Sequence, residues 1–211
     1  MCIRDRFKPI PSITRIPGRL ITTASADVAL KGLSYLLEAM AKLRTERDIT
    51  LTIIGKPRSG HSDDLITKLG LREHINFVSG VTDERIVELY AEAEVAVVPS
   101  LYEGFSLPAI EAMCTGTPLV ATDGGALPEV TGKDGETVFG CKAGDAEGLA
   151  AKIRQALDDE PSRTRIGLAG RQRVVERWSW THCAKLTVDQ YREVLAMPAN
   201  VAKLRKNGRI R

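Results

Sequence analysis

The chain has 211 residues, of which 43% are hydrophobic and 27% charged, and a formal net charge of +3 at pH 7. This composition is ordinary for a globular domain with its own core, and so small a net charge gives no indication of nucleic-acid binding. Cys2, Cys114, Cys141 and Cys183 are widely scattered with no CxxC pair, which argues against a disulfide framework or a zinc site and favours reduced thiols.

Strands and helices alternate regularly along most of the chain. Residues 1–18, punctuated by three prolines, are expected to be an interdomain linker. Apolar patterns then predict the elements, with Gly70, Asp83, Gly116 and Asp145 as helix caps. The expected strands are 19–24, 50–55, 75–80, 94–99, 118–122 and 136–140, and the expected helices are 31–44, 64–70, 84–93, 107–116, 126–131, 146–158, 162–177 and 180–195.

Short β-branched strands without strict alternation indicate a sheet buried on both faces. Together with the intervening helices they predict an α/β, Rossmann-like, doubly wound parallel sheet over residues 19–195. Ligands of such folds lie beyond the carboxyl ends of the strands, so the loops that follow strands should carry the function.

The end of the chain, 196–211, is a basic tail. It is interpreted either as a solvated, frayed end or as a contact with an anionic membrane surface or with another part of the protein. There is no signal peptide and no apolar run as long as a membrane span, so we expect a cytoplasmic protein that is at most membrane-associated.

Two common phosphate-binding motifs are missing. No GxGxxG follows the first strand, which weakens the case for a dinucleotide dehydrogenase. Residues 55–62, GKPRSGHS, nearly match a P-loop, but His61 stands where the lysine that grips the outer phosphates is needed. We therefore expect a turn at this segment.

The most informative segment is 100–113, SLYEGFSLPAIEAM, which begins where the strand 94–99 ends. Gly104 allows the backbone to approach a ligand closely, and Leu107-Pro108 begin a helix whose open N–H groups suit a phosphate. The segment also carries two glutamates, whose carboxylates can accept hydrogen bonds from ribose hydroxyls. Each glutamate taken alone is equally compatible with a solvated or locally paired side chain.

Glu103 and Glu111, eight positions apart, resemble the E-x7-E signature of retaining GT-B glycosyltransferases of family four (glycosyl transferases group 1). Further segments resemble other motifs of that family, in the same order along the chain. These are FKP (7–9) at the linker, DVALKG (27–32) at the donor diphosphate, FVSGV (77–81) at the base, the GGxPE-like GGALPE (124–129) and WSW (178–180) before the final helices.

The resemblance implies that this chain is the C-terminal, donor-binding half of a GT-B enzyme, with a nucleotide sugar as substrate and with no metal ion or cofactor. Glu103, beside the donor sugar, and Lys31, which would neutralise the leaving diphosphate, are the candidate catalytic residues. Glu111 would bind the ribose. The candidate donor-binding residues are Ser25, Gly32, Gly80, Val81, Ser100, Gly104, Phe105, Ser106, Leu107, Glu111 and Glu129, of which the backbone of 105–107 would hold the diphosphate.

Departures from the family pattern affect these expectations. Ser25 stands six residues before Lys31, where the family usually has an arginine, which implies a weaker phosphate grip unless another cation substitutes. Ser106 replaces a common glycine, and Glu129 is equally explained as a first-turn acid favoured by the helix dipole. The resemblance begins at the linker, so the acceptor-binding N-terminal half is expected as the partner, and the chain alone is expected to bind donor weakly without turnover.

Two other functions stay open on the sequence. One is a non-catalytic nucleotide- or sugar-binding module, which the serine at position 25 favours. The other is a GT-B-fold phosphorylase or epimerase, for which the phosphate-handling residues are not evident. The base, the donor sugar and the acceptor are not specified by these motifs.

Overall fold

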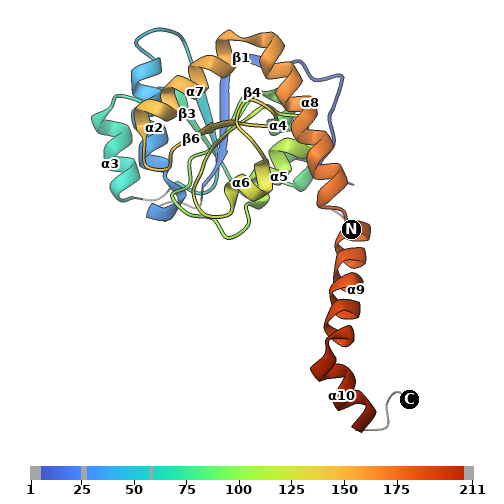
Figure 1. Ribbon diagram of the computed structural model, residues 1–211. Helices are drawn as coiled ribbons and strands as arrows, with labels where there is room; N and C mark the ends of the chain where they lie inside the picture. Colours follow the sequence, from blue (N-terminus) through green and yellow to red (C-terminus); the bar gives the residue numbers. More distant parts are fainter. Residues whose placement is uncertain (1–5, 25–27, 58, 207–211) are drawn as a thin grey trace.

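The computed structural model describes residues 6–24, 28–57 and 59–206. Within these ranges the centre of the molecule is a six-stranded, wholly parallel sheet in the order β3-β2-β1-β4-β5-β6 (Figure 1). The strands are β1 Ile16–Thr23, β2 Thr50–Ile54, β3 Ile75–Val78, β4 Ala93–Val98, β5 Leu119–Thr122 and β6 Phe139–Cys141. The predicted doubly wound sheet is confirmed, and the strand order reverses between β1 and β4, where such folds bind ligands.

Helices cover both faces of the sheet because its strands are apolar on both sides. On one face, Leu20 of β1 packs with the core side chains of α2 Leu33–Leu43, α3 His61–Lys68 and α7 Ala146–Asp158. On the other face, Ile21 of β1 packs with those of α4 Asp83–Glu92, α5 Leu107–Cys114 and α6 Leu127–Thr131. Helix α8, Glu160–Arg177, contributes Ile166 to the first core and Val174 to the second. Two short 3-10 turns, Ala29–Lys31 and Arg72–His74, complete this part of the chain.

Three of the four predicted helix caps are confirmed. The Asp145 side chain accepts from the N–H of Gly148, and Gly70 and Gly116 adopt left-handed conformations just after α3 and α5, as expected. The prediction that Asp83 caps α4 is wrong. Thr82 is the capping residue, since its hydroxyl accepts from the N–H of Arg85 at 3.3 Å, and Asp83 is the first helical residue.

Two helices extend away from the α/β domain (Figure 1). Helix α9, Trp180–Ala196, begins at the Ser179 cap, has no buried residue and is followed by α10, Pro198–Lys206. The range expected as a frayed basic tail is therefore helical as far as Lys206. At the other end, β1 begins at Ile16, so the last residues of the expected linker 1–18 are strand.

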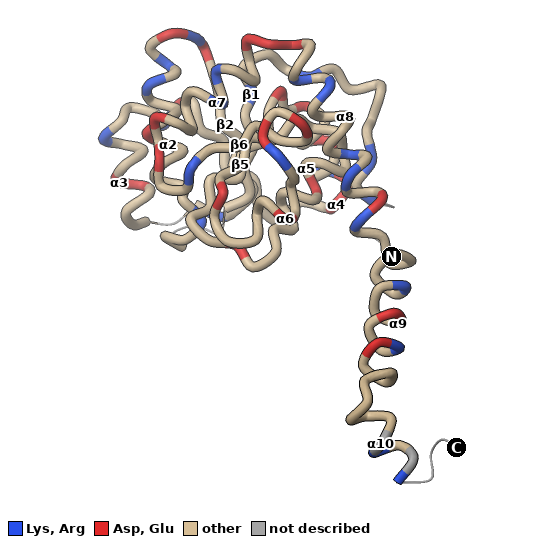
Figure 2. Tube along the Cα trace, in the orientation of Figure 1, with Lys and Arg blue, Asp and Glu red and all other residues tan. Residues whose placement is uncertain are grey.

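Charges of both signs are spread over the α/β domain, whereas α9 is mostly uncharged (Figure 2). None of the helices in the described part of the chain has the length and apolar character needed to cross a membrane.

Candidate functional site

Three loops meet at the carboxyl ends of β1, β4 and β5. The N–H of Leu101, after β4, donates to the carbonyl of Leu30, after β1, at 2.8 Å. The carbonyl of Glu103 accepts from the N–H of Ala126, after β5, at 2.7 Å, and Glu103 also forms a β-bridge with Gly125. These backbone bonds join the three loops at the point where the strand order reverses, which is where ligands of this fold class bind.

Two glycines allow these loops to approach so closely. Gly32 has a left-handed backbone with φ of 65°, and a Cβ there would lie 2.0 Å from the carbonyl oxygen of Pro99. A Cβ on Gly124 would lie 2.5 Å from the carbonyl oxygen of Ser100. A side chain at either position would force the loops apart.

The predicted catalytic residues Lys31 and Glu103 form an ion pair at this junction. The Nζ of Lys31 lies 2.8 Å from Oε1 of Glu103, and the same oxygen accepts from the hydroxyl of Ser100 at 2.9 Å. The Glu103 side chain is only 9% exposed, whereas that of Lys31 is 31% exposed. The hydroxyl of Thr122 donates to the Ser100 carbonyl, so β5 supports the same cluster.

The start of α5 borders this cluster. Ser106 is buried and caps the helix by accepting from the N–H of Ala109 at 3.4 Å, and Pro108 has no N–H. Leu107 and Phe105 are exposed, and the ring of Phe105 packs edge-on against Trp178, with centroids 5.0 Å apart. The N–H of Leu107 is thus the helix donor best placed to meet an anion.

Glu111 lies further along α5 and is half-buried. Its Oε2 is 3.4 Å from the phenol oxygen of Tyr90, which is itself 3.1 Å from the hydroxyl of Thr23 at the end of β1. Burial raises the pKa of the Glu111 carboxyl, and the hydrogen bond from Tyr90 opposes that rise. Burial and the phenol of Tyr90 thus act on this pKa in opposite directions, and burial has the larger effect.

The remaining predicted residues make none of the contacts described above for Lys31 and Glu103. Gly80, with φ of 70°, and Val81 follow β3 at the edge of the sheet. Glu129 is exposed in the first turn of α6, where its carbonyl accepts from Arg173. Gly104 is exposed in the loop before α5. Ser25 lies outside the described residues.

Tyr90 and Thr122 are two polar residues of the site that the sequence does not predict. Both belong to segments whose apolar pattern indicates core, and both are at least 95% buried. Nothing in residue type or spacing distinguishes them until α4 and β5 are placed against α5 and the Ser100 loop.

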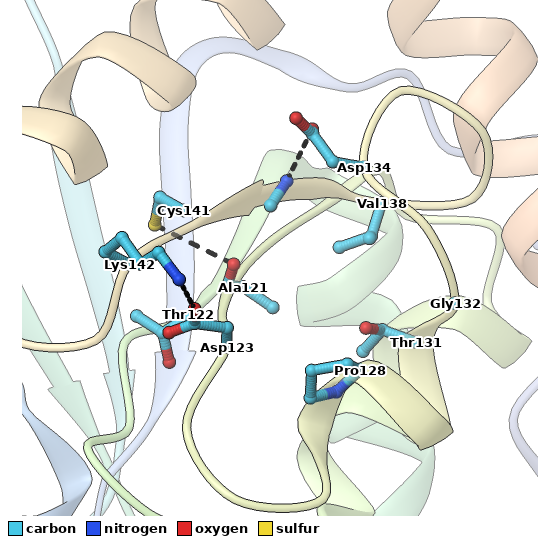
Figure 3. Close-up of a pocket in the computed structure, with 11 residues that line it drawn as sticks. Ala121, Thr122, Asp123, Pro128, Thr131, Gly132, Asp134, Val138, Cys141 and Lys142 are labelled. Carbon is cyan, nitrogen blue, oxygen red and sulfur yellow. Dashed lines mark hydrogen bonds and ion pairs between the residues drawn. The ribbon is translucent and has the colours of Figure 1, made fainter.

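Two pockets open near these loops. One, of about 430 Å³, lies between Ala29, Tyr35 at the start of α2, His61 at the start of α3 and Leu101, beside the ion-pair cluster. The other, of about 310 Å³, lies at the ends of β5 and β6 (Figure 3). There Asp123 pairs with Lys142 at 2.7 Å, and the thiol of Cys141 points toward the carbonyl of Ala121, with its pKa raised to about 11 mainly by burial.

The described residues offer no group of three or more His, Cys, Asp or Glu side chains that could hold a metal ion. The groups that the junction presents are a cation, a buried carboxylate and backbone N–H groups. These are the groups that bind phosphate and sugar hydroxyls.

Comparison with known proteins finds a family match over most of the chain. Residues 14–173 match the model described as Glycosyl transferases group 1. The chain is 46% identical over 190 residues to the MMP alpha-(1->4)-mannosyltransferase of Mycolicibacterium hassiacum, which covers 90% of this chain and 46% of that protein. The chain spans about half the length of the curated relatives it matches.

Solved structures agree. The C-terminal domain of LpcC, a group 1 glycosyl transferase family protein of Francisella tularensis, superposes with a TM-score of 0.72 at 26% identity, covering 84% of this chain and 98% of that one. HepE of Anabaena, in complex with UDP, superposes with a TM-score of 0.78 at 21% identity, covering 92% of this chain and 56% of that one. The second likeness shows the shared fold, which is one half of a GT-B architecture.

Proposed function

This chain belongs to the glycosyl transferases group 1 family, and we propose that it is the donor-binding domain of an enzyme that transfers a hexosyl group from a nucleoside-diphosphate sugar with retention of anomeric configuration. The observation that carries the proposal is the cluster of Lys31, Glu103 and the start of α5 at the reversal of strand order. HepE, of the same fold, is known with bound UDP, which supports a nucleotide as the ligand.

In this proposal the diphosphate lies between Lys31 and the peptide N–H groups of 105–107. The departing nucleotide gains negative charge in the transition state, so a cation and aligned donors fixed beforehand lower the barrier. The partly exposed side chain of Lys31 supports this role because a ligand can reach it. The mechanism involves no metal ion and no separate cofactor.

The two glutamates contact different parts of the donor. Glu111 accepts hydrogen bonds from the ribose hydroxyls, while Glu103 faces the sugar and its phosphates. Gly80 and Val81 follow β3, which lies two strands from β1 in the sheet, and they border the base. Ser25 in place of the usual arginine leaves Lys31 with more of the phosphate charge to neutralise, which weakens the affinity for donor.

The acceptor is held by a second half that corresponds to the part of the relatives this chain does not cover. Helix α9 supports this because it carries a stripe of exposed apolar side chains at helical spacing, among them Trp180, Tyr191 and Leu195. These side chains are 53–69% exposed, which is a surface that favours coverage by protein.

The proposal is tested by joining this chain to an acceptor-binding half of the family. The joined protein is supplied with UDP-, GDP- and ADP-hexoses, and the anomeric configuration of the product is read by proton NMR. Transfer with retention that is lost in a Lys31→Met variant supports the proposal. Nucleotide binding without transfer favours a non-catalytic module, and sugar release that requires inorganic phosphate favours a phosphorylase.

A further inference from the structure

Helix α4 contributes one buried hydroxyl to the neighbourhood of Glu111. We infer that Tyr90 is a positioning residue whose phenol O–H holds the Glu111 carboxylate in the orientation and the ionised form that ribose recognition requires. The inference rests on the proposed function, because it assumes that Glu111 binds the ribose.

The geometry begins with the phenol oxygen of Tyr90. It lies 3.1 Å from the Thr23 hydroxyl, 3.4 Å from Oε2 of Glu111 and 3.5 Å from the carbonyl of Pro108. A phenol has one proton to donate, and an ionised carboxylate is its strongest acceptor here because the hydrogen bond is charge-assisted. Thr23 then donates to the phenol oxygen, so a chain of hydroxyls runs from the end of β1 to Glu111.

Packing fixes the phenol in place. Tyr90 is 2% exposed, and the ring of Phe7, from the segment that precedes β1, meets its ring edge-on with centroids 6.3 Å apart. Low local polarity strengthens a hydrogen bond to a charge, and it also makes the loss of that bond more costly. A phenylalanine would fill the same space, so the hydroxyl is the feature that needs a role.

Other charges near α5 are engaged elsewhere in the described part of the chain. The phenol of Tyr90 donates to Glu111, and this hydrogen bond lowers the Glu111 pKa that burial raises. The charged groups on the surrounding elements have these partners: Glu94 of β4 pairs with Arg163 of α8, Arg171 and Arg173 of α8 donate to the carbonyls of Cys114, Glu129 and Val130, and Arg85 of α4 pairs with Glu88 and Glu92.

The experiment compares the whole chain with its Tyr90→Phe variant. Tyr191→Phe, on exposed α9, is the matched control because it makes the same change far from Glu111. Carbon-13 NMR follows the titration of the Glu111 carboxyl without ligand, assigned through Glu111→Gln. The expected result is a midpoint that moves to higher pH in Tyr90→Phe and stays unchanged in Tyr191→Phe.

Nucleotide affinity supplies the second readout. Calorimetric titration with UDP, GDP and ADP should show about a tenfold weaker affinity in Tyr90→Phe, and the affinity should fall away at a higher pH than in the parent chain. In a Glu111→Gln background, Tyr90→Phe should have little further effect. If Tyr90 only stabilised the fold, Tyr90→Phe would lower the free energy of unfolding without changing the pH dependence of nucleotide affinity.

The inference would be overturned if the Glu111 carboxyl had the same titration midpoint in Tyr90→Phe as in the parent chain. It would also be overturned if nucleotide affinity had the same pH dependence in both proteins. If Tyr90→Phe does not fold, the chain labelled with 3-fluorotyrosine replaces it, since a more acidic phenol is a stronger donor and should lower the midpoint. If no variant and no parent chain binds a nucleotide, the proposed function is what fails, and the ligand-free titration alone decides whether Tyr90 holds Glu111.

Discussion

Lys31 Nζ and Glu103 Oε1 lie 2.8 Å apart although 72 positions separate the two residues in the sequence. The pair joins the loop after β1 to the loop after β4 at the centre of the candidate site. In the free chain the cation proposed to grip the diphosphate is thus already neutralised by a carboxylate. A diphosphate must compete with Glu103 for this ammonium, which affects how each residue responds to substitution.

Glu103→Gln should increase the affinity for a free nucleoside diphosphate by roughly tenfold, equivalent to about 1.4 kcal/mol, because it removes a negative charge beside the phosphates. The amide can still accept from Ser100. Glu46→Gln, which breaks an exposed pair with Arg154, is the matched control and should leave the affinity unchanged. Calorimetric titration measures both. A weaker affinity in Glu103→Gln would mean that the carboxylate itself contacts the ligand.

Gly32→Ala should destabilise the fold by about 2 to 4 kcal/mol, since the new Cβ would strain a left-handed backbone and overlap the Pro99 carbonyl. Gly70→Ala is the control, because Gly70 has almost the same φ, 66° against 65°, but a Cβ there meets nothing within 4 Å. It should cost only about 1 kcal/mol. Urea unfolding gives both values. If Gly32→Ala and Gly70→Ala lowered the free energy of unfolding by the same amount, the close approach of Gly32 to Pro99 would not limit which side chain fits there.

Glu111→Gln should stabilise the chain at pH 7 while weakening nucleotide binding. Burial raises the pKa of Glu111 above its ordinary value of 4.5, so the folded state holds this proton to a higher pH than the unfolded state does. The ionised carboxyl therefore costs stability as the pH rises above 4.5, and the amide does not. The difference in unfolding free energy between variant and parent should shrink as the pH falls to 4.5. A constant difference would contradict this account.

Val188→Glu on α9 should change the free energy of unfolding by no more than about 0.5 kcal/mol, because Val188 is 45% exposed and no residue of α9 is buried. Val174→Glu on α8 is the contrasting variant, since Val174 is 1% exposed and its replacement would bury an unpaired charge. In a protein that carries both halves, Val188→Glu should weaken their association. A large loss in this chain alone would mean that α9 packs on the α/β domain in solution.

The sequence predicts the order of strands and helices and the loops that carry the site. Buried β-branched strands and single-face helices are properties of short segments, as are the caps at Gly116 and Asp145. The wrong cap at Asp83 shows the limit of such reasoning. Thr82 and Asp83 are both good capping residues, and only the extended backbone of Thr82 decides between them.

Long-range pairings were not predictable in the same way. The pairing of Lys31 with Glu103 and of Tyr90 with Glu111 depends on which loops and helices the parallel sheet brings together. A buried tyrosine in an amphipathic helix has the same sequence pattern whether its hydroxyl serves a carboxylate or only the core. The exposure of α9 was likewise not predictable, because the spacing of its apolar residues equally suits a helix packed against the domain.

The junction of Lys31, Glu103 and α5 is proposed to bind a nucleoside diphosphate, and calorimetric titration of the chain with UDP, GDP and ADP measures that binding. Lys31→Met and Lys133→Met are titrated alongside, the second removing an exposed lysine whose side chain is 82% accessible. We predict that one nucleotide binds preferentially, that Lys31→Met loses at least about tenfold in affinity, and that Lys133→Met binds as the parent does. Equal binding by Lys31→Met, or no binding of any nucleotide at about 1 mM, would mean that this junction is not a diphosphate site.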